Sequence, residues 1–204
     1  MASQITHISY GRKVIDLFLK DKQVDERKFY IGTVFPDIRY LKVIDRDKTH
    51  IDNPTTKGLK ENTNSFELGC YTHALIDQER ELTIKRSGFY EVLPNDSITT
   101  YAAKFLEDEI MYPLFKGWSE IIAYLDYITD EELKLIPKEA AYKWHKMLQD
   151  YFKSPPNKTS VTEFAEALGF DDKLIQAVTN RVEELRWNPK AMNIIKATYG
   201  ELFK

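Results

Sequence analysis

The segment SFELGCYTHALIDQER, residues 65–80, constrains the fold of this chain more than any other. Its small and apolar side chains recur at steps of three and four residues, which places them on one face of a predicted helix. His73 and Asp77 lie on that same face, with side chains about 5–6 Å apart, so both can reach one cation. Gly69, one turn before His73, removes a side chain where another element must come close. A core histidine hydrogen-bonded to its own aspartate is the ordinary alternative.

The other segments also follow helical spacing and none alternates as a β-strand does, so the sequence predicts an all-α fold. The predicted helices begin near residues 4, 26, 65, 97, 118, 130, 160 and 172. The predicted caps of the first three are Thr6, Asp25 and either Asn64 or Ser65. The clearest break, KSPPNKTS, separates a helical domain, residues 1–153, from a helical extension, residues 158–204, which packs on it or forms one domain with it.

Two further ligand-type side chains occur at predicted helix ends. His7 lies in the first turn of the first helix, on its apolar side. Asp37 follows Pro36, which ends or kinks the second helix in GTVFPDIRYL. Ordinary explanations exist for both, a helix-end histidine for His7 and a turn-forming aspartate for Asp37.

The polar stretch DRDKTHIDNPTTKGLKENTN, residues 45–64, is predicted to be a long loop, and it contains His50. Long ordered loops in compact domains are often functional. An EF-hand calcium site is excluded, because His50 stands where that loop needs glycine and Thr56 where it needs glutamate.

The side chains singled out so far are imidazoles and carboxylates, which are the ligands that zinc, iron and manganese bind. They come from distant segments, so only a folded scaffold can bring them together. We expect a metal site formed by His7, Asp37, His50, His73 and Asp77.

Asp108 and His145 are two further residues of ligand type. Asp108 interrupts the aromatic face of the predicted helix over residues 97–112, which is costly unless its carboxylate has a partner. It is a candidate sixth ligand, or an acceptor that orients a ligand. His145 has no acidic partner at helical spacing and is predicted to be structural.

Four segments in order resemble the zinc-dependent phospholipase C family, whose wider relatives include the single-strand-specific zinc nucleases. They are THISYGRKVID, YIGTVFPDIRYL, KTHID and FELGCYTHALIDQ, spread over roughly residues 5–80. The resemblance implies a multi-helix bundle of the phospholipase C and zinc nuclease type, with zinc as the cofactor and manganese or iron as alternatives. It also implies the same five ligands, with Asp77 able to serve two ions.

The chain departs from that family after residue 77. Residues 78–88, QERELTIKRSG, hold no histidine, and the next strong helix offers Asp108 but no HxxxE pair. The chain begins with Met1, whereas the mature family enzymes use an N-terminal tryptophan as a ligand. The resemblance therefore implies one complete metal site and a second, partial one.

The expected chemistry is metal-dependent hydrolysis of a phosphate ester, as in a phosphodiesterase. A bound divalent ion lowers the pKa of its water towards ~7 and polarises the phosphoryl oxygen. Asp37 is the predicted catalytic residue, binding the ion and taking a proton from water. The expected partner is a small-molecule or lipid phosphate ester, and the sequence leaves the substrate and the oligomeric state open.

Composition narrows the partners and the compartment. The net charge is −3, with basic and acidic residues mixed along the chain, so nucleic-acid binding is not expected. No apolar stretch has the length of a membrane span, and the N-terminus lacks the apolar run of a signal peptide. The cytoplasm is the default expectation, although a mature form whose signal had been removed would look the same.

Two alternatives remain open. One is a non-catalytic helical protein of the same fold, stabilised by a single metal ion. The other is an HD-type phosphohydrolase, which needs adjacent histidine and aspartate. This chain has His50-Ile51-Asp52 instead, so the HD-type reading is the less favoured of the two.

Overall fold

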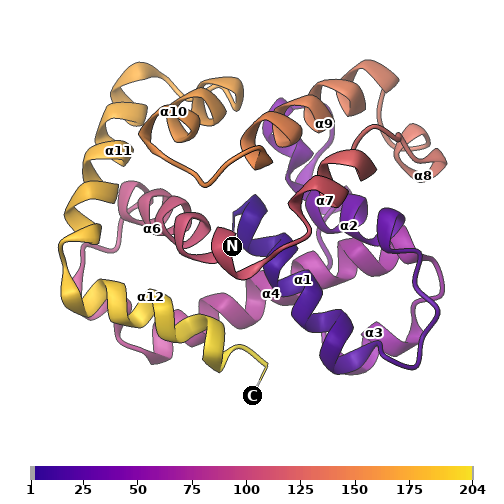
Figure 1. Cartoon of the computed structure of the whole chain (residues 1–204), viewed down its shortest axis with the longest axis horizontal. Coiled ribbons are helices and arrows are strands. Elements are labelled where there is room, and N and C mark those ends of the chain that lie inside the picture. Colours follow the sequence, from indigo (N-terminus) through magenta and orange to yellow (C-terminus); the bar gives the residue numbers. More distant parts are fainter. Residues whose placement is uncertain (1–2, 204) are drawn as a thin grey trace.

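Helix α4, Ser65–Arg86, is the element on which the N-terminal half of the molecule packs. The computed structural model describes residues 3–203, which contain α-helices and short 3-10 helices and no strand. Helices α1, α2, α3, α5 and α12 all contact α4 (Figure 1). The all-α prediction is therefore confirmed.

The remaining elements are listed here in chain order. They are α1 Gln4–Phe18, α2 Glu26–Val34, η1 Phe35–Leu41, η2 Arg46–Lys48, α3 Thr56–Glu61, α5 Phe89–Val92, α6 Ser97–Met111, η3 Tyr112–Leu114, α7 Trp118–Tyr124, α8 Asp130–Leu133, α9 Lys138–Phe152, α10 Lys158–Ala167, α11 Asp172–Arg186 and α12 Pro189–Glu201. In the described residues, no helix is both long and apolar enough to cross a bilayer.

Helix starts follow the predicted caps in two of three cases. The Asn64 side chain accepts hydrogen bonds from the first backbone N–H groups of α4, and Asp25 accepts one at the start of α2. Such caps satisfy N–H groups that have no partner within the helix. The prediction for Thr6 is wrong, because α1 already begins at Gln4 and Thr6 lies inside its first turn.

Two glycines let α2 and α4 cross with their backbones in contact. A Cβ on Gly69 would lie 2.1 Å from the carbonyl oxygen of Phe29, and one on Gly32 would lie 2.1 Å from that of Phe66. No side chain fits at either position, which is the close approach predicted for Gly69. The crossing brings the end of α2 against the middle of α4, where His73 lies.

Two predicted segments differ in detail. The loop over residues 45–64 contains η2 and α3, and the Thr55 side chain caps α3. The predicted helix over residues 130–151 is two helices, α8 and α9, because Pro137 lies between them. Thr129 and Glu132 form a capping box at the start of α8.

The C-terminal helices share a hydrophobic core with the rest of the chain. Helix α11 packs along α6, and α12 packs on α4, α5 and α6 (Figure 1). Buried Ile175 and Leu185 of α11 belong to the same apolar cluster as Phe29 of α2. At the KSPPNKTS break, Asn157 caps α10 through a capping box with Ser160, so this helix begins two residues earlier than predicted.

Candidate metal centre

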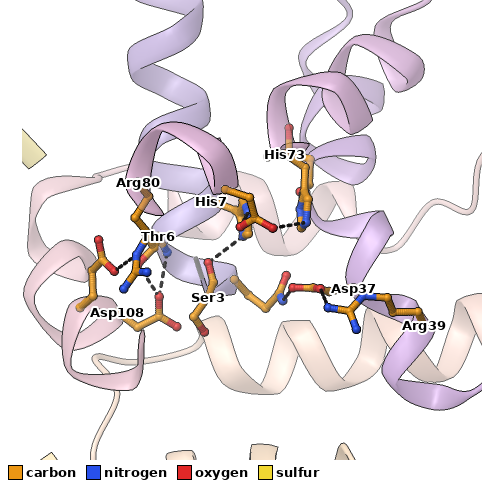
Figure 2. Close-up of polar contacts among 12 residues, drawn as sticks. Ser3, Thr6, His7, Asp37, Arg39, His73, Arg80 and Asp108 are labelled. Atoms are coloured by element: carbon orange, nitrogen blue, oxygen red, sulfur yellow. Dashed lines mark hydrogen bonds and ion pairs between the residues drawn. The ribbon is translucent and has the colours of Figure 1, made fainter. Parts of the chain in front are cut away.

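The five side chains expected at a metal site converge from four segments of the chain. His7 comes from α1, Asp37 from η1, His50 from the loop after η2, and His73 and Asp77 from α4. Two overlapping groups have ligand atoms within 4.8 Å of one another: His7, Asp37 and His73, and His50, His73 and Asp77. All five side chains are buried. Figure 2 shows the His7 and His73 rings side by side at the centre of this cluster.

Backbone carbonyls fix the protonation of two of the rings. Nδ1 of His7 lies 3.0 Å from the carbonyl oxygen of Ser3, and Nδ1 of His73 lies 2.9 Å from that of Thr33. A carbonyl can only accept, so each Nδ1 carries the proton and donates it. In the neutral ring, Nε2 then carries a lone pair. Metal-binding histidines commonly donate their other N–H to a backbone carbonyl in this way.

The Nε2 atoms of both rings lie near the carboxylate of Asp77. Nε2 of His7 lies 3.3 Å from Oδ1 of Asp77, and Nε2 of His73 lies 3.6 Å from Oδ2. Burial, with the neighbouring His7 adding to it, lowers the pKa of His73 to about 3, so this ring is neutral at physiological pH. A neutral Nε2 and a carboxylate oxygen are both acceptors and repel each other unless a cation lies between them. Tetrahedral zinc, with bonds of about 2.0–2.1 Å, spaces its ligands at about this separation.

His50 adds a third imidazole of the same kind. Its ring meets that of His73 edge-on, with centroids 5.0 Å apart, and its Nδ1 lies 3.0 Å from the Thr49 hydroxyl oxygen. Burial lowers its pKa to about 4, so it too is neutral. In the described residues, Nε2 of His7, His50 and His73 is buried and makes no hydrogen bond. Buried ring nitrogens without a hydrogen-bond partner are candidate ligands of a divalent metal ion. His73 shares one group of ligand atoms with His7 and the other with His50.

Asp37 is held as an oriented carboxylate. Its Oδ2 accepts a hydrogen bond of 2.7 Å from the Gln4 amide, and its Oδ1 accepts one of 3.2 Å from Arg39. Burial raises the pKa of Asp37, but nearby positive charge, that of Arg39 included, outweighs burial and lowers the pKa overall. The side chain is therefore ionised, as a metal ligand must be.

Asp108 lies outside both groups of ligand atoms. Its Oδ1 accepts hydrogen bonds from the backbone N–H and the hydroxyl of Thr6, at 2.8 and 2.7 Å (Figure 2). Its Oδ2 accepts one of 3.0 Å from the Tyr151 hydroxyl. These hydrogen bonds fix the first turn of α1, from which His7 extends. Burial raises its pKa to about 6.

A buried ion pair joins α4 and α6 beside the centre. Arg80, one turn after Asp77, donates a hydrogen bond to Glu107, and both side chains are almost fully buried (Figure 2). Partners of this kind satisfy each other's charge in a low-dielectric interior. The pair therefore fixes α4, which carries His73 and Asp77, against α6.

His145 lies apart from the metal centre. Its Nδ1 is 3.0 Å from the carbonyl oxygen of Leu125, and its Nε2 is 2.8 Å from Oε1 of Glu132. These buried contacts agree with the predicted structural role. Helical spacing gives no acidic partner for His145 because Glu132 belongs to a different helix, α8.

A cleft and a small cavity are each lined by part of the five-residue cluster. A cleft of about 260 Å³ is lined by His50 and Asp77 together with Arg46 and Gln78. A smaller cavity of about 30 Å³ is lined by Asp37 and, from α6, Lys104. The centre is thus reachable although its ligands are buried.

Sequence reasoning missed two cationic side chains next to this centre. Arg39 follows Asp37 by two residues, and its guanidinium lies 4.2 Å from the centre of the Tyr40 ring. Lys104 lies on the buried face of α6, three residues after Tyr101. The three-residue spacing from Tyr101 could have identified Lys104, because it places the lysine on the aromatic face of the helix. A lysine on such a face is rarely buried unless it has a partner.

Comparison with known proteins adds no family to this picture. No protein-family model, no curated protein and no solved structure matches the chain. The resemblance to the zinc-dependent phospholipase C family rests on the sequence motifs alone and stays a prediction.

Proposed function

We propose that this protein is a metal-dependent hydrolase of phosphate esters, of the phospholipase C-like phosphodiesterase type, with zinc as the preferred ion. One observation carries the proposal: the buried Nε2 atoms of His7 and His73 lie 3.3 and 3.6 Å from the carboxylate oxygens of Asp77. A divalent cation is the species that three such acceptors would bind in common.

The two ligand groups overlap at His73. Nε2 of His73 has a single lone pair and would therefore bind only one ion. The two groups of ligand atoms, which share His73, would then be alternative positions of that one ion. A second ion would need the Asp77 carboxylate to bridge to it. We therefore expect one tightly bound ion per chain, with at most a weaker second one.

The chain's own residues supply the rest of the chemistry. When bound, a divalent ion would polarise a phosphoryl oxygen and make water acidic enough to react near pH 7. Asp37, oriented by Gln4 and Arg39, is the proposed catalytic carboxylate. Its lowered pKa keeps it ionised, which both a ligand and a proton acceptor require. The cleft beside His50 and Asp77 is the proposed entry for the ester.

Hydrolysis of bis(4-nitrophenyl) phosphate tests the proposal. We expect activity that is lost on treatment with a chelator and regained with zinc or manganese. Asp37→Asn should lower kcat roughly a hundredfold or more, as expected for loss of a general base. Asp47→Asn is the matched control, because Asp47 is exposed and lies in the same region of the chain. Hydrolysis that persists in the chelator would contradict the proposal.

The depth of the centre favours a second candidate function, a non-catalytic protein stabilised by its metal. Five buried ligand side chains are enough to fill the coordination sphere of zinc and leave no position open for substrate, as in structural zinc sites. In that case zinc would raise the melting temperature of the wild type and not that of Asp37→Asn, and no phosphate ester would be hydrolysed. An HD-type phosphohydrolase has less support, because Asp52 is exposed and lies outside both ligand groups.

A further inference from the structure

Lys104 is a buried lysine whose position neither the fold nor the proposed metal ligands explain. It lies on α6 between Tyr101 and Phe105, and only 6% of its surface is exposed. Its ammonium lies 5.4 Å from the centre of the Tyr101 ring. Burying an ammonium in apolar surroundings is costly unless an anion or an oriented polar group balances it.

Lys104 lines the small cavity that Asp37 also lines. Gln4, Tyr40 and Tyr101 supply the polar wall, and apolar side chains of α6 and α10 close the rest. The cavity, at about 30 Å³, has room for a small group and excludes a bulky one. A compact polar group of the ligand therefore fits in this cavity. The rest of the ligand would occupy the larger cleft beside His50.

The charges around the cavity point to the sign of that group. The charged side chains near the cavity are the carboxylates Asp37 and Asp77 and the cations Arg39 and Lys104. A divalent cation bound to the histidines would add positive charge beside Lys104, which a bound oxyanion would offset.

We propose that the cavity between Asp37 and Lys104 is an oxyanion subsite, in which Lys104 binds an oxygen of a phosphate group held at the metal centre. The inference rests on the proposed function, because it needs the ion to be bound. Arg39 is the second cation within this region, but its guanidinium already binds Asp37 and Tyr40. Lys104 is therefore the residue that should distinguish phosphate from uncharged ligands.

Binding of inorganic phosphate to the zinc-loaded protein, followed by calorimetry, tests this subsite. Lys104→Met keeps the length and apolar character of the stem, and Lys104→Arg keeps the charge. We expect Lys104→Met to weaken phosphate binding roughly tenfold to a hundredfold, as for loss of a hydrogen bond to a charged group, and Lys104→Arg to restore most of it. Lys173→Met is the control, because Lys173 is exposed on α11. Zinc content should be equal in all of these proteins.

The outcomes separate the subsite from the proposed function. If Lys104→Met binds phosphate within twofold of the wild type while zinc content is unchanged, the subsite does not exist. If phosphate binding depends on Lys104 but no ester is hydrolysed, the subsite stands and the hydrolase proposal fails. In an active protein, Lys104→Met should raise KM more than it lowers kcat, whereas a general loss of folding would reduce the fraction of active protein without raising KM.

Discussion

The imidazole rings of His7 and His73 stack face to face, with centroids 3.8 Å apart and planes inclined by only 8°. They come from α1 and α4, and each donates its Nδ1 proton to a backbone carbonyl. Both therefore present Nε2 to the carboxylate of Asp77. Two parallel imidazoles beside one carboxylate are the structural basis of the proposed metal centre, and the predictions below concern how the fold holds them there.

The crossing of α2 and α4 should not tolerate a methyl group at Gly69. The Cβ of Gly69→Ala would meet the Phe29 carbonyl oxygen at 2.1 Å and the Thr33 amide nitrogen at 2.7 Å. The helices must then separate, so we expect a loss of about 3 kcal/mol or more in the free energy of unfolding. Gly200→Ala is the control, because nothing lies within 4 Å of its Cβ. Equal stability of both variants in urea would contradict the account of the crossing.

Asp108 should matter for stability more than for metal binding. Asp108→Ala removes the acceptor for Thr6 and Tyr151, and buried donors left without a partner cost about 1–3 kcal/mol each. We expect the free energy of unfolding to fall by about 3 kcal/mol, while folded protein at saturating zinc keeps its metal. Asp47→Ala should change neither quantity. Loss of the metal from folded Asp108→Ala would instead make Asp108 a ligand.

His145 should behave as a structural histidine. Replacing it with alanine leaves Glu132 buried with one partner fewer, and breaking such a buried pair costs about 3–5 kcal/mol. Zinc content per folded chain should be unchanged. Tyr142→Ala on the same helix, where the side chain is 66% exposed, should have little effect on stability. A zinc content that falls in His145→Ala would contradict this assignment.

The metal-free protein should lose stability as the pH falls below 6.5. The pKa of His73 is lowered from its ordinary value of 6.5 to about 3, so between these values the unfolded chain binds a proton that the folded chain does not. Stability is then present above pH 6.5 and decreases by up to about 1.4 kcal/mol per pH unit below it. His50, with a pKa lowered to about 4, acts in the same direction.

Urea unfolding in a chelator at pH 7.5 and pH 5.0 measures this effect. Asp108 acts in the opposite direction, because its pKa is raised to about 6 and its contribution to stability is lost as the pH rises. The wild type is therefore compared with His73→Gln. Both proteins contain Asp108, so its contribution cancels in the comparison. We expect the wild type to lose more stability at pH 5.0 than the variant does. Equal losses would contradict the assignment of a neutral, buried His73.

Local spacing predicted the parts of this centre that lie within one helix. His73 and Asp77 were identified from their separation along α4, and Gly69 from its position on the same face. His7, Asp37 and His50 were identified because they are ligand-type side chains at helix ends or in the long polar loop, and because the motifs around them resemble those of a metal-dependent family. These three side chains come together only because α1, η1 and the loop pack on α4. That packing depends on contacts between residues distant along the chain, which local spacing does not predict.

Partners that lie far apart in the chain were beyond sequence reasoning. The carbonyl oxygens of Ser3 and Thr33, which fix the two imidazoles, have no signature in the sequence because every residue carries a carbonyl. Glu132 and His145 belong to different helices, separated by a proline, so helical spacing does not relate them. Lys104 was passed over because its neighbours on α6 read as an ordinary aromatic core stripe.

Metal content per chain is the most direct test of the central claim, that these side chains bind a divalent ion. It is measured by plasma mass spectrometry on protein purified without a nickel column and then incubated with zinc. The account predicts about one equivalent in the wild type and in the exposed control Asp47→Asn, and a loss of most of it in His73→Gln. No bound metal in the folded wild type, or the same amount in His73→Gln, would contradict it.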